Sequence, residues 1–168
     1  MKAVMISVAM LFVGCGGKAE PVVQNLAPVA EPVVAAPVNP EAVARIDAFL
    51  ADPEQGDGAG VIELVSNDRG VYVLIPDQLR PDLFMEVIDE RSMGLLIAGF
   101  VAGNARPQFV DGVKSDRLTD GMAGALKVYR ALKLSTPALG EADEHERNGT
   151  LDEWTRTWMA NHPNQPGR

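Results

Sequence analysis

The chain has 168 residues, of which 46% are hydrophobic and only 5% aromatic. Its 15 basic and 23 acidic side chains give a net charge of −8, which argues against a protein that binds the nucleic-acid backbone through a basic surface. Its single cysteine excludes an internal disulfide and a metal site built from several cysteines.

Residues 1–14 have the organisation of a secretory signal peptide. A lysine at position 2 precedes an uncharged run over 3–13, which is too short to cross a bilayer as a helix. The run ends in Phe12-Val13-Gly14-Cys15, which resembles the lipobox of bacterial lipoproteins. That resemblance implies that Cys15 carries acyl chains such as palmitate and becomes the first residue of the mature, membrane-anchored protein. Each buried CH₂ contributes about 0.8 kcal/mol, so several chains together make release negligible.

The residue after the cysteine bears on localisation. Gly16 stands where an aspartate would resemble the inner-membrane retention signal of lipoproteins. The resemblance therefore implies a cell-envelope protein, in the outer membrane if the bacterium has two membranes. The alternative is an ordinary cleaved signal in which Cys15 is an inert apolar residue.

Residues 15–40 are predicted to form an extended tether that begins at the lipidated cysteine. Prolines recur at positions 21, 28, 32, 37 and 40 among valines and alanines, without an aromatic residue. Repeated prolines prevent helices and sheet ladders and favour polyproline II. At about 3.1 Å per residue, the tether reaches roughly 75–80 Å when fully extended. A proline-motif ligand for another domain is the alternative interpretation.

The folded domain is predicted over residues 41–160 as a small, mainly α bundle of about five or six helices. Asn39 is expected to cap the first helix, with Pro40 in its first position, and Asp52-Pro53 to end it. The glycines at 56, 58 and 60 predict a flexible break. Residues 61–75 fit either a β-hairpin or a short helix followed by an extended segment. The helix is favoured because nothing else in the chain offers a sheet for a hairpin to join.

Four further helices are predicted. The first covers 89–105, is uncharged from Ser92 onward, carries small residues at intervals of four that allow close helix contact, and is expected to end at Pro107. Others are predicted over 118–134, from 137 to about 147, and from 151 onward. Trp154 and Trp158 in the last helix are interpreted as core residues rather than as a sugar platform. Residues 161–168 are predicted to be a disordered tail.

A polar turn after the 89–105 helix is the first candidate interaction site, with Asn104, Arg106, Gln108, Lys114 and Arg117 as its residues. Six basic and three acidic residues lie between 104 and 134, a charge of +3, whereas three basic and twelve acidic residues between 41 and 90 give −9. A locally positive segment on an acidic domain predicts an anionic partner. The alternative is that its arginines pair with the acidic half of the same domain. The runs 102–108 and 126–132 resemble a family of uncharacterised small helical bacterial proteins, and this resemblance implies no activity.

The second candidate lies in residues 144–155, which resemble an EF-hand calcium loop. Glu144, Glu146, Asn148 and Asp152 occupy ligand positions, but Thr155 stands where the loop needs a bidentate glutamate. The sequence therefore predicts no metal site, with these four residues as a weak candidate. The same segment also predicts a helix end at 148–149 and a capping box in which Thr150 and Glu153 begin the next helix.

Motifs of catalysis are not evident in the sequence. It has two histidines and no phosphate loop, nucleophile elbow or His-Glu-x-x-His motif, and acylation of Cys15 leaves no thiol. We therefore expect a protein-interaction domain on a membrane tether, with another envelope protein as partner and no cofactor. A domain that binds a small ligand or an ion such as calcium is the alternative, and an enzyme is the third interpretation.

Overall fold

The computed structural model of the chain describes residues 38–76, 83–84 and 89–162. The predicted signal peptide, Cys15 and the tether up to residue 37 lie outside the described residues. Of the two units into which the chain divides, every described residue belongs to the second.

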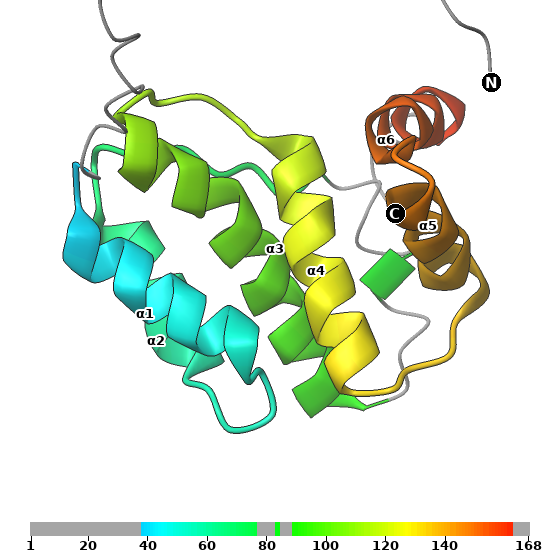
Figure 1. Cartoon of the computed structure of the whole chain (residues 1–168), viewed down its shortest axis with the longest axis horizontal. Helices are drawn as coiled ribbons and strands as arrows, with labels where there is room; N and C mark the ends of the chain where they lie inside the picture. Colours follow the sequence, from blue (N-terminus) through cyan, green and yellow to red (C-terminus); the bar gives the residue numbers. More distant parts are fainter. Residues whose placement is uncertain (1–37, 77–82, 85–88, 163–168) are drawn as a thin grey trace, which may run out of the picture. The chain divides into compact units, whose positions relative to one another are not determined.

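The described part of this second unit is a bundle of six α-helices and contains no strand, which confirms the predicted fold class. The helices are α1 (Pro40–Ala51), α2 (Gly58–Asn67), α3 (Glu90–Asp111), α4 (Leu118–Ala131), α5 (Pro137–Arg147) and α6 (Leu151–Asn161). Helix α3 is central: α1 and α2 pack on one side of it and α4 on the other, with α5 and α6 beyond α4 (Figure 1). No helix in the described residues is long and apolar enough to span a membrane.

The first two helices begin at side-chain caps. The Asn39 Oδ1 accepts a hydrogen bond from the Ala42 N–H at 3.1 Å, as predicted. The Asp57 Oδ1 accepts one from the Gly60 N–H at 2.8 Å, so Gly58 and Gly60 begin α2 and the predicted flexible break is wrong. Residues 71–76 then follow without helix or strand. The helix interpretation of 61–75 is thereby confirmed over the hairpin.

Helix α3 continues past Pro107, where the sequence predicted its end. The proline removes one backbone donor, but other contacts hold the last turn. Gly112 adopts a left-handed conformation with φ of 70°, and its N–H donates to the Gln108 carbonyl at 2.8 Å. Phe109 is buried in the same turn. The helix therefore ends one turn later, at a glycine cap.

Glycines set the separation of α3 and α4. A Cβ added to Gly103 would overlap the Asp120 carbonyl oxygen, and one added to Gly124 would overlap the Gly99 carbonyl oxygen. The two backbones therefore touch directly, which is the close approach that the small-residue spacing predicted.

Aromatic side chains attach α6 to the bundle. Trp154 is buried, and its ring centroid lies 5.1 Å from that of the partly buried Trp158. This confirms that the tryptophans pack on the core. Helix α6 includes Asn161, and the His162 ring stacks on Trp158 at 4.1 Å. The described residues thus include Asn161 and His162, which the sequence assigned to the tail, while the other residues of the predicted tail lie outside the described residues.

Candidate functional site

Gln108, predicted at the surface of the polar turn, is buried. Its Oε1 accepts a hydrogen bond from the Tyr72 N–H and its Nε2 donates to the Tyr72 carbonyl, both at 2.9 Å. The Oε1 also accepts from the Ser115 N–H at 3.2 Å. The amide thus binds the 71–76 segment as a neighbouring strand would, and its burial argues against direct contact with a partner.

Asn104 is fully buried beside it. Its Oδ1 accepts hydrogen bonds from the Gln108 Nε2 at 3.0 Å and from the Arg117 N–H at 3.1 Å, and its Nδ2 donates to Asp116 at 2.6 Å. The side chain therefore fixes the loop that leads into α4. Its role is internal to the fold.

The basic residues of the predicted turn have partners within the domain. Arg106 binds both carboxylate oxygens of Asp47 on α1, at 2.5 and 3.0 Å. This hydrogen-bonded pair lowers the pKa of Asp47 and raises that of Arg106. Arg117 pairs with Asp111 at 2.7 Å, and the Lys114 Nζ donates to the Arg69 carbonyl at 3.0 Å. Pairing with the acidic half is thus observed for Arg106, whereas Arg117 pairs with Asp111 at the end of α3.

The calcium-like loop connects α5 to α6. Asn148 ends α5, and Gly149 adopts a positive φ of 71°. Glu146 pairs with Arg130 at 2.6 Å, and no cluster of three or more potential ligands among the described residues is arranged to hold a metal ion. The Thr150 Oγ1 lies 2.8 Å from His145 Nδ1 instead of capping α6, so the predicted capping box lacks its side-chain hydrogen bond.

One hydrogen bond joins the second candidate segment to the start of α4, two residues beyond the first candidate turn. The Thr119 Oγ1, in the first turn of α4, donates to the Asp152 Oδ1, in the first turn of α6, at 3.0 Å. Asp152 also pairs with Arg156 at 2.7 Å. The hydrogen bond from Thr119, followed by that from Arg156, lowers the pKa of Asp152. The first turns of α4 and α6 therefore lie together, next to Arg117 of the first candidate turn and with Asp152 of the second candidate segment.

A pocket of about 380 Å³ lies at this junction. Its lining residues are Asp116, Arg117, Leu118, Thr119, Asp120, Asp152, Thr155 and Arg156. Thr155 is 1% exposed, and its Oγ1 and the buried Arg117 Nε have no hydrogen-bond partner among the described residues. The sequence singled out Thr155 only as a missing calcium ligand, because its neighbours in space are distant in the chain.

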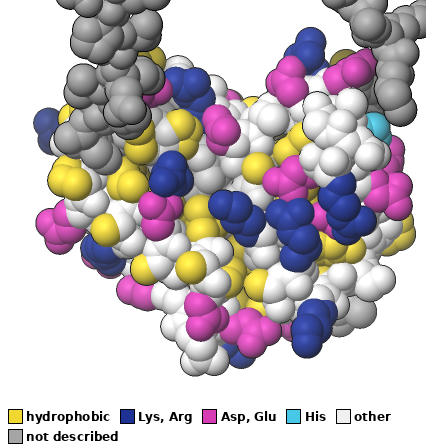
Figure 2. All heavy atoms as spheres, in the orientation of Figure 1, with side chains coloured by type: hydrophobic (Ala, Val, Ile, Leu, Met, Phe, Trp, Pro, Cys, Tyr) yellow, Lys and Arg dark blue, Asp and Glu magenta, His cyan; other side chains and the backbone are white. Residues whose placement is uncertain are grey.

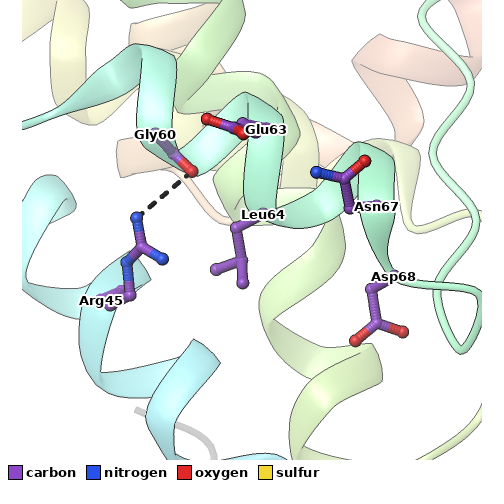
Figure 3. Close-up of a pocket in the computed structure, with 6 residues that line it drawn as sticks. All are labelled: Arg45, Gly60, Glu63, Leu64, Asn67 and Asp68. Carbon is purple, nitrogen blue, oxygen red and sulfur yellow. Dashed lines mark hydrogen bonds between the residues drawn. The ribbon is translucent and has the colours of Figure 1, made fainter.

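A second pocket, of about 410 Å³, lies between α1 and α2. Arg45 reaches across from α1, with its Nη2 3.5 Å from the Gly60 carbonyl oxygen, while Glu63, Leu64 and Asn67 line it from α2 (Figure 3). None of the described side chains that line it is a buried polar group without a partner. It is therefore the weaker candidate site.

The surface itself carries a few large apolar side chains. Tyr72 and Leu74 are about half exposed, at 48% and 50%, and Val113 is 53% exposed. On the face drawn in Figure 2, basic and acidic side chains are interspersed rather than gathered by sign. The exposed apolar side chains therefore mark a candidate contact surface better than the charged side chains do.

Comparison with known proteins does not assign the chain to a family. No protein-family model, curated protein or solved structure matches the chain. Functional proposals therefore rest on the residues and their geometry, and the resemblance to uncharacterised small helical bacterial proteins stays a prediction.

Proposed function

We propose that this protein is a lipoprotein of the bacterial cell envelope, anchored through Cys15, whose helical domain binds another envelope protein. The observation that carries the proposal is the sequence Phe12-Val13-Gly14-Cys15 after the uncharged run 3–13. Gly16 favours the outer membrane where there are two membranes. Acyl chains on Cys15 would hold the protein at the membrane surface.

The chain between the anchor and the domain fits this proposal. Helix α1 begins at Pro40, so the proline-rich residues 16–37 separate it from Cys15. Extended at about 3.1 Å per residue, they allow the domain to search for a partner well away from the lipid surface. The exposed Tyr72, Leu74 and Val113 offer apolar contacts of the kind found in protein interfaces.

The anchor is tested by Cys15→Ser. We expect this variant to lose labelling by a palmitate analogue and to leave the membrane fraction, since serine offers no thiol to acylate. Gly16→Asp is the matched control: it keeps the thiol, so labelling should persist, and in a two-membrane bacterium the protein should move to the inner membrane. Unchanged labelling of Cys15→Ser would contradict the proposal.

The partner is tested with a photo-crosslinking amino acid placed at Tyr72 or Leu74 in intact cells. We expect a discrete adduct with one envelope protein from both positions, because both side chains are half exposed and apolar. The exposed Gln55, in the α1–α2 connection, is the control position and should give none. An identical pattern from all three positions, or no adduct, would contradict a protein-interaction domain.

A further inference from the structure

The large hydrophobic side chains that are exposed in the described part of the chain share one region of the surface. They are Val38, Tyr72, Leu74 and Val113, with exposed fractions of 70%, 48%, 50% and 53%. We call this region the α3-end surface, because three segments of the chain carry these residues to the C-terminal end of α3. Single exposed apolar side chains are ordinary, whereas a group of them marks a contact site.

The first and last of these segments meet at the final turn of α3. The Asn39 N–H donates to the Phe109 carbonyl at 3.1 Å, so the chain enters the domain beside this turn. Val38 lies against Gly112, where an added Cβ would be 3.0 Å from the Val38 Cγ2. Val113 is the next residue along the chain, so the two exposed valines are neighbours.

The 71–76 segment lies beside the same turn. The Gln108 Oε1 accepts hydrogen bonds from the Tyr72 N–H at 2.9 Å and from the Ser115 N–H at 3.2 Å. One side chain of α3 therefore holds this segment next to the loop that follows α3. Leu74 is two residues from Tyr72 and is exposed to the same extent.

The charges carried by the two segments around this surface cancel. Residues 68–74 and 111–117 contain three basic and three acidic side chains, a sum of zero: Arg69, Lys114 and Arg117, with Asp68, Asp111 and Asp116. Residues 41–90 as a whole carry −9. Salt screens charges that lie more than about 10 Å apart, so the local sum governs contact with a charged surface. An anionic bilayer would repel the acidic half of the domain but not this apolar, locally neutral area.

We propose that the α3-end surface docks on the lipid bilayer that holds the anchor. The inference rests on the proposed acylation of Cys15, and lipid occupies the surface until the envelope partner replaces it. Residues 16–37 join Cys15 to Val38, so this surface is the part of the domain nearest to the anchor along the chain. Aliphatic side chains and tyrosine favour the interfacial region of a bilayer. Four side chains bury little area, so docking is reversible and the tether can still carry the domain outward.

A fluorophore on this surface tests docking in vesicles. The sequence has a single cysteine, so acylation of Cys15 leaves no free thiol, and Leu74→Cys or Val113→Cys each provide one labelling site. The acylated full-length mature protein is placed in protein-free vesicles of phosphatidylethanolamine and phosphatidylglycerol. We expect the emission of an environment-sensitive fluorophore at both positions to shift to shorter wavelength and to be quenched by nitroxide-labelled lipids.

Gln55→Cys is the matched control position. Arg91, in the first turn of α3, donates to the Glu54 carbonyl at 3.0 Å, so the α1–α2 connection lies at the opposite end of α3 (Figure 1). A helix of 22 residues is about 33 Å long. A label on this exposed connection should therefore show neither the shift nor the quenching.

The outcomes separate docking from anchoring. Equal quenching at Gln55 and at the two surface positions, or no quenching in a protein that stays on the vesicles, would overturn docking and leave the anchor intact. A wavelength shift without quenching would also overturn docking, because protein rather than lipid would then cover the surface. If the protein without an introduced cysteine takes up the fluorophore, Cys15 is not acylated, and the anchor and this inference both fail.

Substitutions on the surface identify the residues in contact with lipid. In the Val113→Cys protein, Tyr72→Asp and Leu74→Asp should each abolish quenching, because a carboxylate is costly to bury in a bilayer. Ala59→Asp, exposed on α2, adds the same charge elsewhere and should leave quenching unchanged. Melting temperatures verify that each variant is folded. Full quenching in both surface variants would overturn the assignment to this surface.

Discussion

Gln108 and Asn104 show how single side chains substitute for secondary structure in this domain. The Gln108 amide pairs with both backbone groups of Tyr72, and Asn104 holds the loop before α4. Residues 71–76 lie in no ladder within the described chain, so side-chain amides supply hydrogen bonds that a sheet would otherwise provide. Buried networks of this kind contribute strongly only when each member is satisfied.

Replacing Gln108 should therefore loosen this segment. Gln108→Met fills a similar volume but leaves the Tyr72 N–H and carbonyl and the Ser115 N–H without this partner. We expect a loss of about 2–4 kcal/mol in the free energy of unfolding, measured by urea denaturation. The exposed Gln55→Met is the control and should cost little. A loss in Gln108→Met no larger than in the control would show that the network contributes nothing to stability.

The Asp47–Arg106 pair gives a stability effect with a defined pH dependence. The hydrogen bond from Arg106 holds the pKa of Asp47 below its ordinary 3.8 in the folded state. The stabilisation is therefore fully present above that value and is lost as the pH falls through the lowered pKa. Because both side chains are partly exposed, at 42% and 47%, Asp47→Asn should cost less than about 1 kcal/mol at neutral pH. The difference from wild type should vanish in acid, and a difference independent of pH would contradict this origin.

At the scale of elements, the contact between α3 and α4 depends on residues without side chains. Gly103 and Gly124 let the two backbones touch, so even a methyl group must displace a helix. Gly94 lies in α3 as well, but a Cβ there would meet nothing within 4 Å. The same substitution should thus have opposite effects at two positions of one helix.

Gly103→Ala should lower the free energy of unfolding by about 1–3 kcal/mol through overpacking against Asp120. Gly94→Ala should raise the free energy of unfolding by about 0.5–1 kcal/mol, because alanine stabilises an exposed helix position more than glycine does. Thermal and urea unfolding of both variants measure the two effects. If Gly103→Ala were as stable as Gly94→Ala, the close packing of α3 on α4 would be incorrect.

Local signals predicted the helices well and the site poorly. Asn39 and Pro40 determine the start of α1 through bonds within one turn, so the sequence alone was sufficient. The prediction that α3 ends at Pro107 was wrong, because the final turn of α3 depends on Gly112 and on the burial of Phe109. The burial of Phe109 depends on how all the helices pack together, and it could not be predicted from the sequence.

The site illustrates the same limit. Asn104 and Gln108 were chosen as polar residues of a turn, yet tertiary packing buries them. The unpaired Thr155 hydroxyl becomes noticeable only once α4 and α6 are placed together. The sequence did identify one residue on each side of this junction, Arg117 and Asp152, because charged and polar side chains are concentrated around both helix ends. Their convergence required the fold.

At the scale of the whole molecule, acidic charge is unevenly paired. Among the described acidic residues between 41 and 90, only Asp47 takes part in a salt bridge. In the second half, Asp111, Asp143, Glu146 and Asp152 all pair with arginines. The α1–α2 half therefore carries mutual repulsion between carboxylates, whereas the α4–α6 half carries attraction between opposite charges.

The dependence of stability on salt shows whether the repulsion between carboxylates or the attraction within ion pairs is larger, since salt screens both. Raising sodium chloride from about 0.01 M to about 1 M shortens the screening length from about 30 Å to about 3 Å. Exposed ion pairs contribute little, so we expect relief of the repulsion to dominate and the melting temperature to rise. At low salt, Glu63→Gln on α2 should raise the melting temperature and reduce its salt dependence, because it removes an unpaired charge from the acidic half. Glu146→Gln, the matched control, should lower the melting temperature because it breaks the bond to Arg130. A melting temperature that falls with salt would show instead that the ion pairs outweigh the repulsion.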